Sequence, residues 1–408
     1  MAIRLSSKLD RLPPYLFARI DAARERAEAR GLTTVSLGIG DPDRDPPEWI
    51  RELLCEEVMR PGNHRYPSYK GHPALHDSAL RFLERRYELA GLTRDNVMTT
   101  IGSKESLANL THALLDPGDL VLYPDPLYPV FVTISQLFGA EAIGIPVHPS
   151  TNFMPDPREH LSVEQLKRVK VLYVNYPHNP TGQTATRNYL QSLVDLAREF
   201  GWSIVSDAAY NEIYYPGADG TLSPPPSLLQ CDGALDCVIE MHSFSKSFNM
   251  TGWRVGFAAG NADLIRALHT MKSNVDSGTF NAIQLAMGRA LDDPRCDGFL
   301  AENREHYLER LNGVCQALDG MGVKYHRPGA SIFVWCELPA NADKHADDSP
   351  DSMAWCARLL DEQGVIVSPG GGYGQWGEGF FRVSLSTPDD KIGMAMERLG
   401  RFVAGGSY

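Results

Sequence analysis

The stretch VKVLYVNYPHNPTGQTATRNYLQSLVDLAREFGWSIVSDAAY (169–210) decides the fold class of this chain. It begins and ends with apolar runs, 169–177 and 202–210, which are typical of buried strands. The residues between them place apolar side chains at positions i, i+3, i+4 and i+7 of one helix face: Leu190, Leu193, Val194 and Ala197. Gly201 is the expected C-terminal stop of that helix. A strand, a helix and a second strand in this order predict an α/β unit with a parallel sheet.

Similar apolar runs extend the pattern on both sides. We predict further buried parallel strands in DLVLYP (119–124), DCVIEMHSFSK (236–246) and RVGFAAG (254–260). Strands that alternate with helices imply a sheet covered by helices on both faces. Ligands of such sheets bind at the carboxyl ends of the strands, so polar residues at those ends are the candidates for function.

The last part of the chain has a different pattern. Three strand-like runs follow one another there: VKYHRPGASIFVWCEL (323–338), GVIVSPG (364–370) and FFRVSLS (380–386). An amphipathic helix that ends near Phe402 follows them, which predicts a smaller α+β domain. The N-terminal segment contains one helix that cannot bury its apolar face alone, so we expect it to join this domain. The predicted division is a large domain of residues 46–290 and a small domain of residues 1–45 and 291–408.

Composition excludes several classes of protein. The 408 residues carry a net charge of −12, which makes nucleic acid and anionic membranes poor partners. The 7 cysteines form no CxxC pair, which disfavours a disulfide framework or a zinc site and predicts a reducing compartment. The N-terminus has no apolar leader, and no segment approaches the length of about 18 apolar residues that a membrane span needs. We therefore expect a cytoplasmic protein.

The segment SFSKSFNMTGWRVG (243–256) contains the most informative lysine. Lys246 follows a buried strand, and an amine in such a pocket loses its proton easily. A neutral amine is the form that makes a Schiff base with an aldehyde. Ser243, Ser245 and Arg254 would suit a phosphate dianion. The alternative is a solvated lysine and arginine in a serine-rich loop.

A carboxylate and a tyrosine follow another apolar strand in SDAAYNE (206–212). Asp207 ends the strand, where an unpaired charge is costly, and a protonated pyridine nitrogen would be a suitable partner. Tyr210 lies on the same loop and could bond the phenolic oxygen of such a ring. Asp207 could equally be the N-cap of a helix.

Two further segments combine turn or helix-start signals with polar side chains. Asn179 lies in NPTG (179–182), which is either a plain turn or a donor to the same phenolic oxygen. Ser103 and Lys104 open a helix, whose N-terminal amides either bind phosphate or are simply capped.

An aromatic residue and a second arginine complete the candidates. Tyr128, in YPDPLYPVF (123–131), could stack on a planar heterocycle or lie half-buried in a proline-rich loop. Arg382 lies in an alternating strand and needs an anionic partner, either an α-carboxylate or a carboxylate in an edge-strand salt bridge.

These elements, in this order and over nearly the whole chain, resemble the fold type I, class I and II aminotransferases that depend on pyridoxal 5′-phosphate (PLP). The resemblance implies an α/β fold in which a large domain has a mainly parallel seven-stranded sheet between helices, beside a small α+β domain. It implies an enzyme that moves an amino group between an L-amino acid and a 2-oxo acid by a ping-pong mechanism, with PLP as cofactor and no metal.

The resemblance also implies roles for individual residues. Lys246 would form the Schiff base and move the proton, Asp207 would pair with the pyridine nitrogen, and Tyr128 would stack on the ring. Tyr210 and Asn179 would bond the phenolic oxygen. The phosphate would lie among these residues: Ser103, Lys104, Ser243, Ser245 and Arg254.

The substrate side and the neighbouring subunit receive roles in the same way. Arg382 would hold the substrate α-carboxylate, with Gly40, Tyr15 and Asn179 beside the substrate. Tyr66 matches a tyrosine that reaches the phosphate of the neighbouring subunit, so the resemblance implies a homodimer with shared active sites.

Finer features resemble the LL-diaminopimelate aminotransferase branch, which exchanges an amino group between LL-diaminopimelate, with tetrahydrodipicolinate as its keto form, and the pair 2-oxoglutarate and glutamate. The matching segments are RLPPYLFARID (11–21), LGIGDPD (37–43), HRYPSYKG (64–71) and KSNVDSGTFNAIQ (272–284). Departures at 330–335 and 368–382 lie on the substrate side and leave open another amino acid, or β- or γ-elimination or replacement on the same scaffold. A ligand-sensing regulator would need a basic DNA-binding segment, which the acidic composition disfavours.

Overall fold

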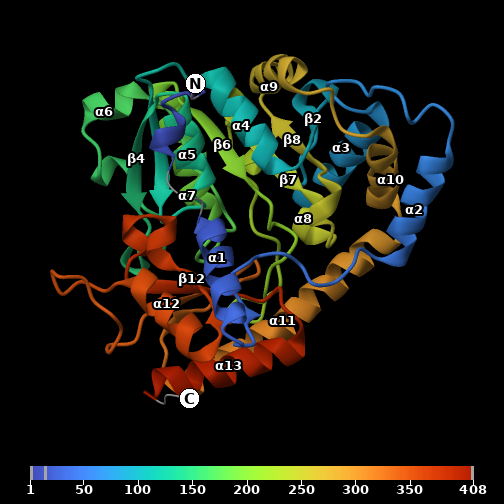
Figure 1. The fold of residues 1–408 in the computed structure, drawn as a ribbon. Coiled ribbons are helices and arrows are strands. Elements are labelled where there is room, and N and C mark those ends of the chain that lie inside the picture. The colour runs from blue at the N-terminus through green and yellow to red at the C-terminus, as the bar shows by residue number, and fades with distance from the viewer. Residues whose placement is uncertain (1–2, 13–15, 406–408) are drawn as a thin grey trace.

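A computed structural model describes residues 3–12 and 16–405 of the chain. Its centre is a seven-stranded sheet that lies between two layers of helices (Figure 1). The strands in spatial order are β2 (Val97–Thr100), β8 (Gly256–Gly260), β7 (Val238–Ser243), β6 (Ser203–Asp207), β5 (Val169–Val174), β3 (Leu120–Asp125) and β4 (Glu141–Pro146). All neighbours are parallel except the two pairs that involve β8, which confirms the predicted mainly parallel sheet.

The direction of β8 corrects one prediction. The run 254–260 was expected to be a parallel strand, but β8 is antiparallel to both β7 and β2. The connection from β7 holds only the short helix α8 (Phe244–Ser247) and a 3₁₀ turn, so the chain never returns to the start of β7. A parallel pair needs a crossover that spans the length of the sheet.

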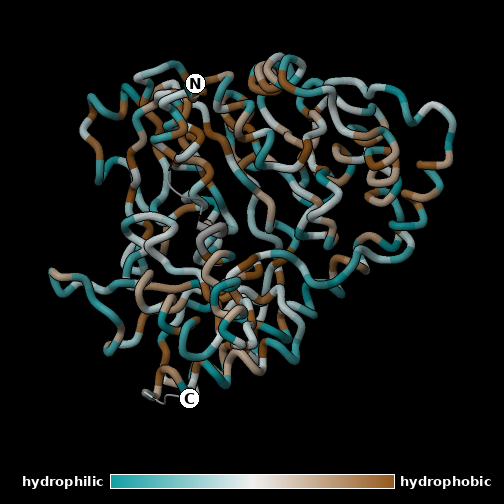
Figure 2. Tube along the Cα trace, viewed as in Figure 1, coloured by the Kyte–Doolittle hydropathy of each residue, from teal (hydrophilic) through white to brown (hydrophobic). Residues whose placement is uncertain are grey.

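Helices cover both faces of this sheet and bury two separate cores. One face packs against α4 (Ser103–Leu114), α5 (Val130–Leu137) and α9 (Ala262–Val275). The other face packs against α2 (Glu48–Met59), α3 (Pro73–Tyr87), α6 (Val163–Arg168), α7 (Arg187–Phe200) and α10 (Asn281–Asp292). Figure 2 shows hydrophobic segments along the central strands, as burial on both faces requires.

Helix α7 is the helix that the opening stretch predicts. Thr186 caps its start by accepting a hydrogen bond from the amide of Tyr189, and Leu190, Leu193 and Val194 are buried. Gly201 ends it with a φ of 77°, the left-handed conformation that glycine adopts without strain. The predicted helix and its stop are therefore confirmed.

The second body of the molecule is the α+β part in the lower half of Figure 1. Its four-stranded antiparallel sheet has the order β12 (Ser368–Pro369), β13 (Phe380–Ser384), β10 (Phe333–Glu337) and β9 (Tyr325–His326). A two-stranded parallel pair joins β1 (Val35–Ser36) to β11 (Val365–Ile366). The helices beside these sheets are α1 (Leu16–Ala29), α11 (Arg295–Met321), α12 (Ser352–Gln363) and α13 (Asp389–Val403).

Among residues 3–12 and 16–405, the structure contains no helix with the length and apolar character needed to cross a membrane. All seven cysteines are free thiols, and six of them are buried.

Arg310, in α11, joins the N-terminal segment to the start of α13. Its side chain, 5% exposed, donates to both carboxylate oxygens of Asp43 at 2.6 and 2.8 Å and to Asp389 at 2.6 Å. Burial opposes ionisation of Asp43, but the hydrogen bonds and charge of Arg310 outweigh it and hold the pKa of that carboxyl below its usual value. The arginine therefore anchors the turn 37–43, which lies beside the candidate active site.

We expect Arg310→Met to lower the free energy of unfolding by about 3 kcal/mol, because it leaves the half-buried Asp43 without its partner. Urea denaturation would measure the change. Arg168→Met, which breaks the exposed pair with Glu141, should cost less than about 1 kcal/mol. A depressed carboxyl pKa stabilises the protein above the unfolded value of about 4 and loses this effect below it. A cost for Arg310→Met that stayed the same at pH 3 would contradict the assignment.

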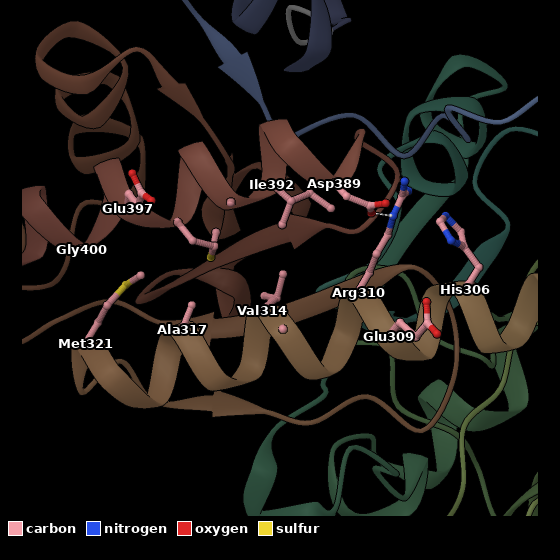
Figure 3. A pocket seen from close by; sticks show the side chains of 13 residues that line it. His306, Glu309, Arg310, Val314, Ala317, Met321, Asp389, Ile392, Glu397 and Gly400 are labelled. Carbon is pink, nitrogen blue, oxygen red and sulfur yellow. Dashed lines mark hydrogen bonds and ion pairs between the residues drawn. The ribbon is translucent and has the colours of Figure 1, made fainter.

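A hollow of about 590 Å³ lies between α11 and α13, and Figure 3 shows its apolar middle, with Val314 and Ala317 on one wall and Ile392 on the other. The ion pair of Arg310 and Asp389 lies toward one end, next to His306 and Glu309. None of the described residues that line it is a lysine. The predicted site residues lie in a different cavity.

Candidate active site

The predicted site residues meet in a cavity of about 460 Å³ at the carboxyl ends of the central strands. Strands β2, β3, β5, β6 and β7 all end at this edge, as the rule for open α/β sheets predicts. The cavity is lined by twelve predicted residues: Gly40, Ser103, Lys104, Tyr128, Asn179, Asp207, Tyr210, Ser243, Ser245, Lys246, Arg254 and Arg382.

Of the two other predicted residues, the structure places only Tyr66. Tyr66 is 87% exposed in the loop between α2 and α3, outside the cavity. Tyr15 lies outside the described residues.

Lys246 lies in α8, directly after β7, and its Nζ donates a hydrogen bond to the carbonyl oxygen of Gly40. Burial lowers the pKa of this amine to about 8, although the nearby charge of Asp41 opposes the shift. The lowered pKa increases the fraction of neutral amine near neutral pH, and the neutral amine is the form that acts as a nucleophile. The alternative of a solvated lysine is wrong.

Asp207 ends β6 below the same cavity. Burial raises its pKa to about 6, while hydrogen bonds from Ser103 and the amide of Ala209 oppose the shift. Its Oδ1 is buried and has no partner in the protein. No helix begins after Asp207, so the helix-cap alternative is wrong. A buried acceptor that lacks a donor fits the protonated nitrogen of a pyridine ring.

The start of α4 and Arg254 form a cradle for an anion. Gly102 caps the helix with a φ of 73°, and a Cβ at this position would lie 2.6 Å from Nη2 of Arg254. Arg254 is itself left-handed, with a φ of 53°, and donates to the carbonyl of Thr251 at 2.7 Å. Helix amides, the Ser103 hydroxyl and a guanidinium together suit a phosphate dianion.

Arg382 is 1% exposed in β13, which lies between β12 and β10 rather than at a sheet edge. It donates to Oδ1 of Asn179 at 2.7 Å and to the carbonyl of Gly38 at 2.6 Å. Its Nε has no partner, and no described carboxylate pairs with it. The edge-strand salt bridge is therefore wrong, and the buried cation has room for an anion that the protein does not supply.

Aromatic rings lie around the guanidinium of Arg382 and along the cavity wall. The guanidinium carbon of Arg382 lies 3.8 Å from the ring centroid of Phe333 and 5.0 Å from that of Tyr373. Phe333 also contacts Tyr210 edge to face, with centroids 5.4 Å apart. Tyr128 lies half-buried on the cavity wall.

Sequence reasoning missed three residues at this site. Asn175 donates to the carbonyl of Asp207 at 2.8 Å and accepts from the amide of Asn179 at 2.9 Å, so it joins two strand ends. Its position at the end of β5 was a usable signal. Phe333 and Tyr373 lie in segments that the sequence places on the substrate side, but nothing in the pattern singles out either ring.

Comparisons with known proteins agree with this geometry. A family model described as aminotransferase class I and II matches residues 33–399. The LL-diaminopimelate aminotransferase of Desulforudis audaxviator is 41% identical over 97% of this chain and 96% of its own length. The enzyme of the same name from Gloeobacter violaceus is 40% identical over 99% of both chains.

Solved structures show the same fold. Substrate-bound BacF from Bacillus subtilis superposes with a TM-score of 0.90 at 28% identity and covers 99% of this chain and 98% of its own. Aspartate aminotransferase from Thermus thermophilus, solved with maleate, has a TM-score of 0.87 at 28% identity and covers 98% and 100%. These matches confirm the predicted fold, enzyme class and cofactor, and the chain belongs to the class I and II family of PLP-dependent aminotransferases.

Proposed function

We propose that this aminotransferase exchanges an amino group between LL-diaminopimelate, with tetrahydrodipicolinate as its keto form, and the pair 2-oxoglutarate and glutamate. The observation that carries the substrate is full-length identity of 40–41% to enzymes of that name. The site geometry adds a buried Arg382 that lacks a carboxylate partner, as an α-amino acid substrate requires.

The residues around the cavity fit PLP, which supplies an electron sink for the carbanion at the substrate α-carbon. Lys246 would hold the cofactor through Nζ, and its depressed pKa would allow the same amine to move a proton. The unpartnered Oδ1 of Asp207 would accept from the pyridine nitrogen and favour its protonated form. Tyr210 and Asn179 would bond the phenolic oxygen, and Tyr128 would cover the ring.

The cofactor phosphate would bind at the start of α4. Its contacts would be the helix amides together with the side chains Ser103, Lys104, Ser243, Ser245 and Arg254. On the substrate side, Arg382 would bind the α-carboxylate, with Gly40 and Asn179 beside it. Tyr15, which the sequence also predicts there, lies outside the described residues.

We also propose a cytoplasmic homodimer with shared active sites. The exposure of Tyr66, 87%, fits a side chain whose partner is a phosphate in the neighbouring subunit. The free cysteines fit a reducing compartment. The two sheets favour a large domain of residues 46–290 and a small domain of residues 1–45 and 291–408, because β1 pairs with β11.

The substrate is tested by a half-reaction panel. Holoenzyme is mixed with single amino acids, and loss of its visible absorbance is followed. LL-diaminopimelate and glutamate should both remove the absorbance without release of ammonia. Another amino acid that reacts in place of LL-diaminopimelate would contradict the substrate and leave the class intact. Ammonia release with retained absorbance would favour the alternative, β- or γ-elimination.

We expect Arg382→Ala to raise the KM for every amino acid and 2-oxo acid substrate by about 100-fold, because loss of a buried charged contact costs a few kcal/mol. Steady-state kinetics with both substrates would measure the change. Arg382→Lys should recover only part of the loss, since a lysine lacks the planar fork. An unchanged KM in Arg382→Ala would contradict the carboxylate role.

A further inference from the structure

Two hydrogen bonds join the end of β3 to the connection between β12 and β13. Asp125 ends β3, is 3% exposed, and its Oδ1 accepts from the amide of Trp376 at 3.2 Å. Two residues later, the amide of Leu127 donates to the carbonyl of Tyr373 at 2.9 Å. We call residues 373–376 the small-domain turn; they lie between β12 and β13.

The turn packs directly on the carboxylate. Gly374 has a φ of 142°, and a Cβ there would lie 2.0 Å from Oδ1 of Asp125. Next to the turn, a Cβ on Gly377 would lie 3.4 Å from Cβ of Pro126. No side chain fits at Gly374, and the absence of one lets the backbone of the turn contact the carboxylate of Asp125 directly.

Burial without a counter-charge makes this carboxylate costly. No described lysine, arginine or histidine forms an ion pair with Asp125. Burial raises its pKa to about 6, and only the amides of Trp376 and Gln375 oppose the shift. The two backbone amides are the partners of this buried carboxylate. An apolar side chain at the same position would destabilise the folded protein less, so stability alone does not account for Asp125.

Tyr373, the first residue of the small-domain turn, indicates a role for Asp125 in substrate binding. Tyr373 is 3% exposed, and its ring lies 5.0 Å from the guanidinium carbon of Arg382. The same ring contacts Trp335 edge to face, with centroids 6.2 Å apart. The turn therefore sets where one of the two rings around the guanidinium lies.

We propose that Asp125 is a positioning residue for substrate binding: it holds the small-domain turn through its backbone amides, and so keeps Tyr373 against the guanidinium of Arg382. The inference rests on the proposed carboxylate role of Arg382. Partners that orient metal-binding side chains are typically worth about 10- to 100-fold in affinity or activity, and we expect an effect at the lower end of this range here.

The test compares Asp125→Ala and Asp125→Asn with the wild-type holoenzyme. The control is Asp119→Asn, which removes a carboxylate at the opposite end of the same strand, where it pairs with Lys170 at 2.6 Å. Hydrogen exchange of the amides of Gln375 and Trp376 reports the turn without substrate. KM and kcat with glutamate and 2-oxoglutarate report the site.

In Asp125→Ala, these amides should exchange at least about 10-fold faster. KM for both substrates should rise about 10-fold, with kcat within about threefold and unchanged visible absorbance. Asp125→Asn, which keeps one acceptor oxygen and the side-chain volume, should show smaller changes of the same kind. Asp119→Asn should match the wild type in all of them.

Tyr373→Leu distinguishes the loss of the contact between Tyr373 and Arg382 from a general loss of stability in Asp125→Ala. It should raise KM like Asp125→Ala, and the double variant should show little further increase, because both changes act through one contact. Unchanged exchange in Asp125→Ala would overturn the hold on the turn, and faster exchange with unchanged KM would overturn the positioning role.

The proposed substrate can fail separately. If the wild-type enzyme does not react with glutamate, the proposed amino-group pair is wrong. The exchange measurement then stands, and the KM comparison uses the amino acid that removes the visible absorbance fastest.

Discussion

Replacement of Lys246 by alanine should abolish transamination, with kcat lower by at least about 10⁴-fold. The variant would lose the amine that we propose holds the cofactor and moves the proton of the substrate α-carbon. Burial and the low pKa of about 8 equip this lysine for both tasks. Stopped-flow absorbance of a single half-reaction would measure the loss, together with the visible spectrum of the loaded variant.

The control for this variant is Lys170→Ala. Lys170 lies away from the cavity, pairs with Asp119 and should keep the wild-type kcat and spectrum. Lys246→Ala should keep the fold and still bind PLP without a covalent bond, because the phosphate cradle at Gly102 and Arg254 is intact. Turnover at the wild-type rate would show that another group does the chemistry.

Asp207→Asn should lower kcat by about 10²- to 10³-fold, because a neutral amide cannot keep the pyridine nitrogen protonated. The visible absorbance should persist, since Lys246 remains. This combination distinguishes the two variants: one loses the cofactor bond, and the other loses the charge that stabilises the developing carbanion. Steady-state kinetics and spectra of the same preparations provide both readings.

The side chain at position 207 also allows a sharper comparison. Asp207→Glu restores the carboxylate, but its longer side chain has to fit at a packed strand end. It should therefore recover only part of the lost kcat. Wild-type kcat in Asp207→Asn would mean that the orphaned Oδ1 has no catalytic partner, and the proposed contact with the ring nitrogen would be wrong.

The sequence could predict those parts of the fold that depend on periodicity. The apolar runs around 169–210 indicated the parallel sheet because strands buried on both faces are apolar throughout. The edge strands β2 and β4 were not recognised. β2 has only four residues, and β4 contains a glycine and a proline, which disguise a strand.

The direction of β8 was mispredicted for a related reason. An apolar run carries no information about whether a strand is parallel or antiparallel to its neighbours. Only the length and path of the connection decide this, and the segment 244–255 is too short to carry the chain back to the start of β7.

At the site, the sequence could predict that Asp207, Asn179 and Lys246 lie close together, because ligands of such sheets bind at the carboxyl ends of the strands. The three residues line one cavity. Contacts between segments far apart in the chain could not be predicted. Asn175 joins two strand ends, and Tyr373 reaches Arg382 because Asp125 holds its turn. The proposed role of Tyr66 depends on a second copy of the chain.

The most direct test of the account asks which amine holds PLP. Holoenzyme is reduced with borohydride, which fixes the cofactor to that amine, and the digested protein is analysed by mass spectrometry. The account predicts that the label lies on Lys246 alone and is absent from Lys246→Ala. A label on Lys104, the other lysine of the cavity, or equal labelling of both proteins would contradict the assignment of Lys246.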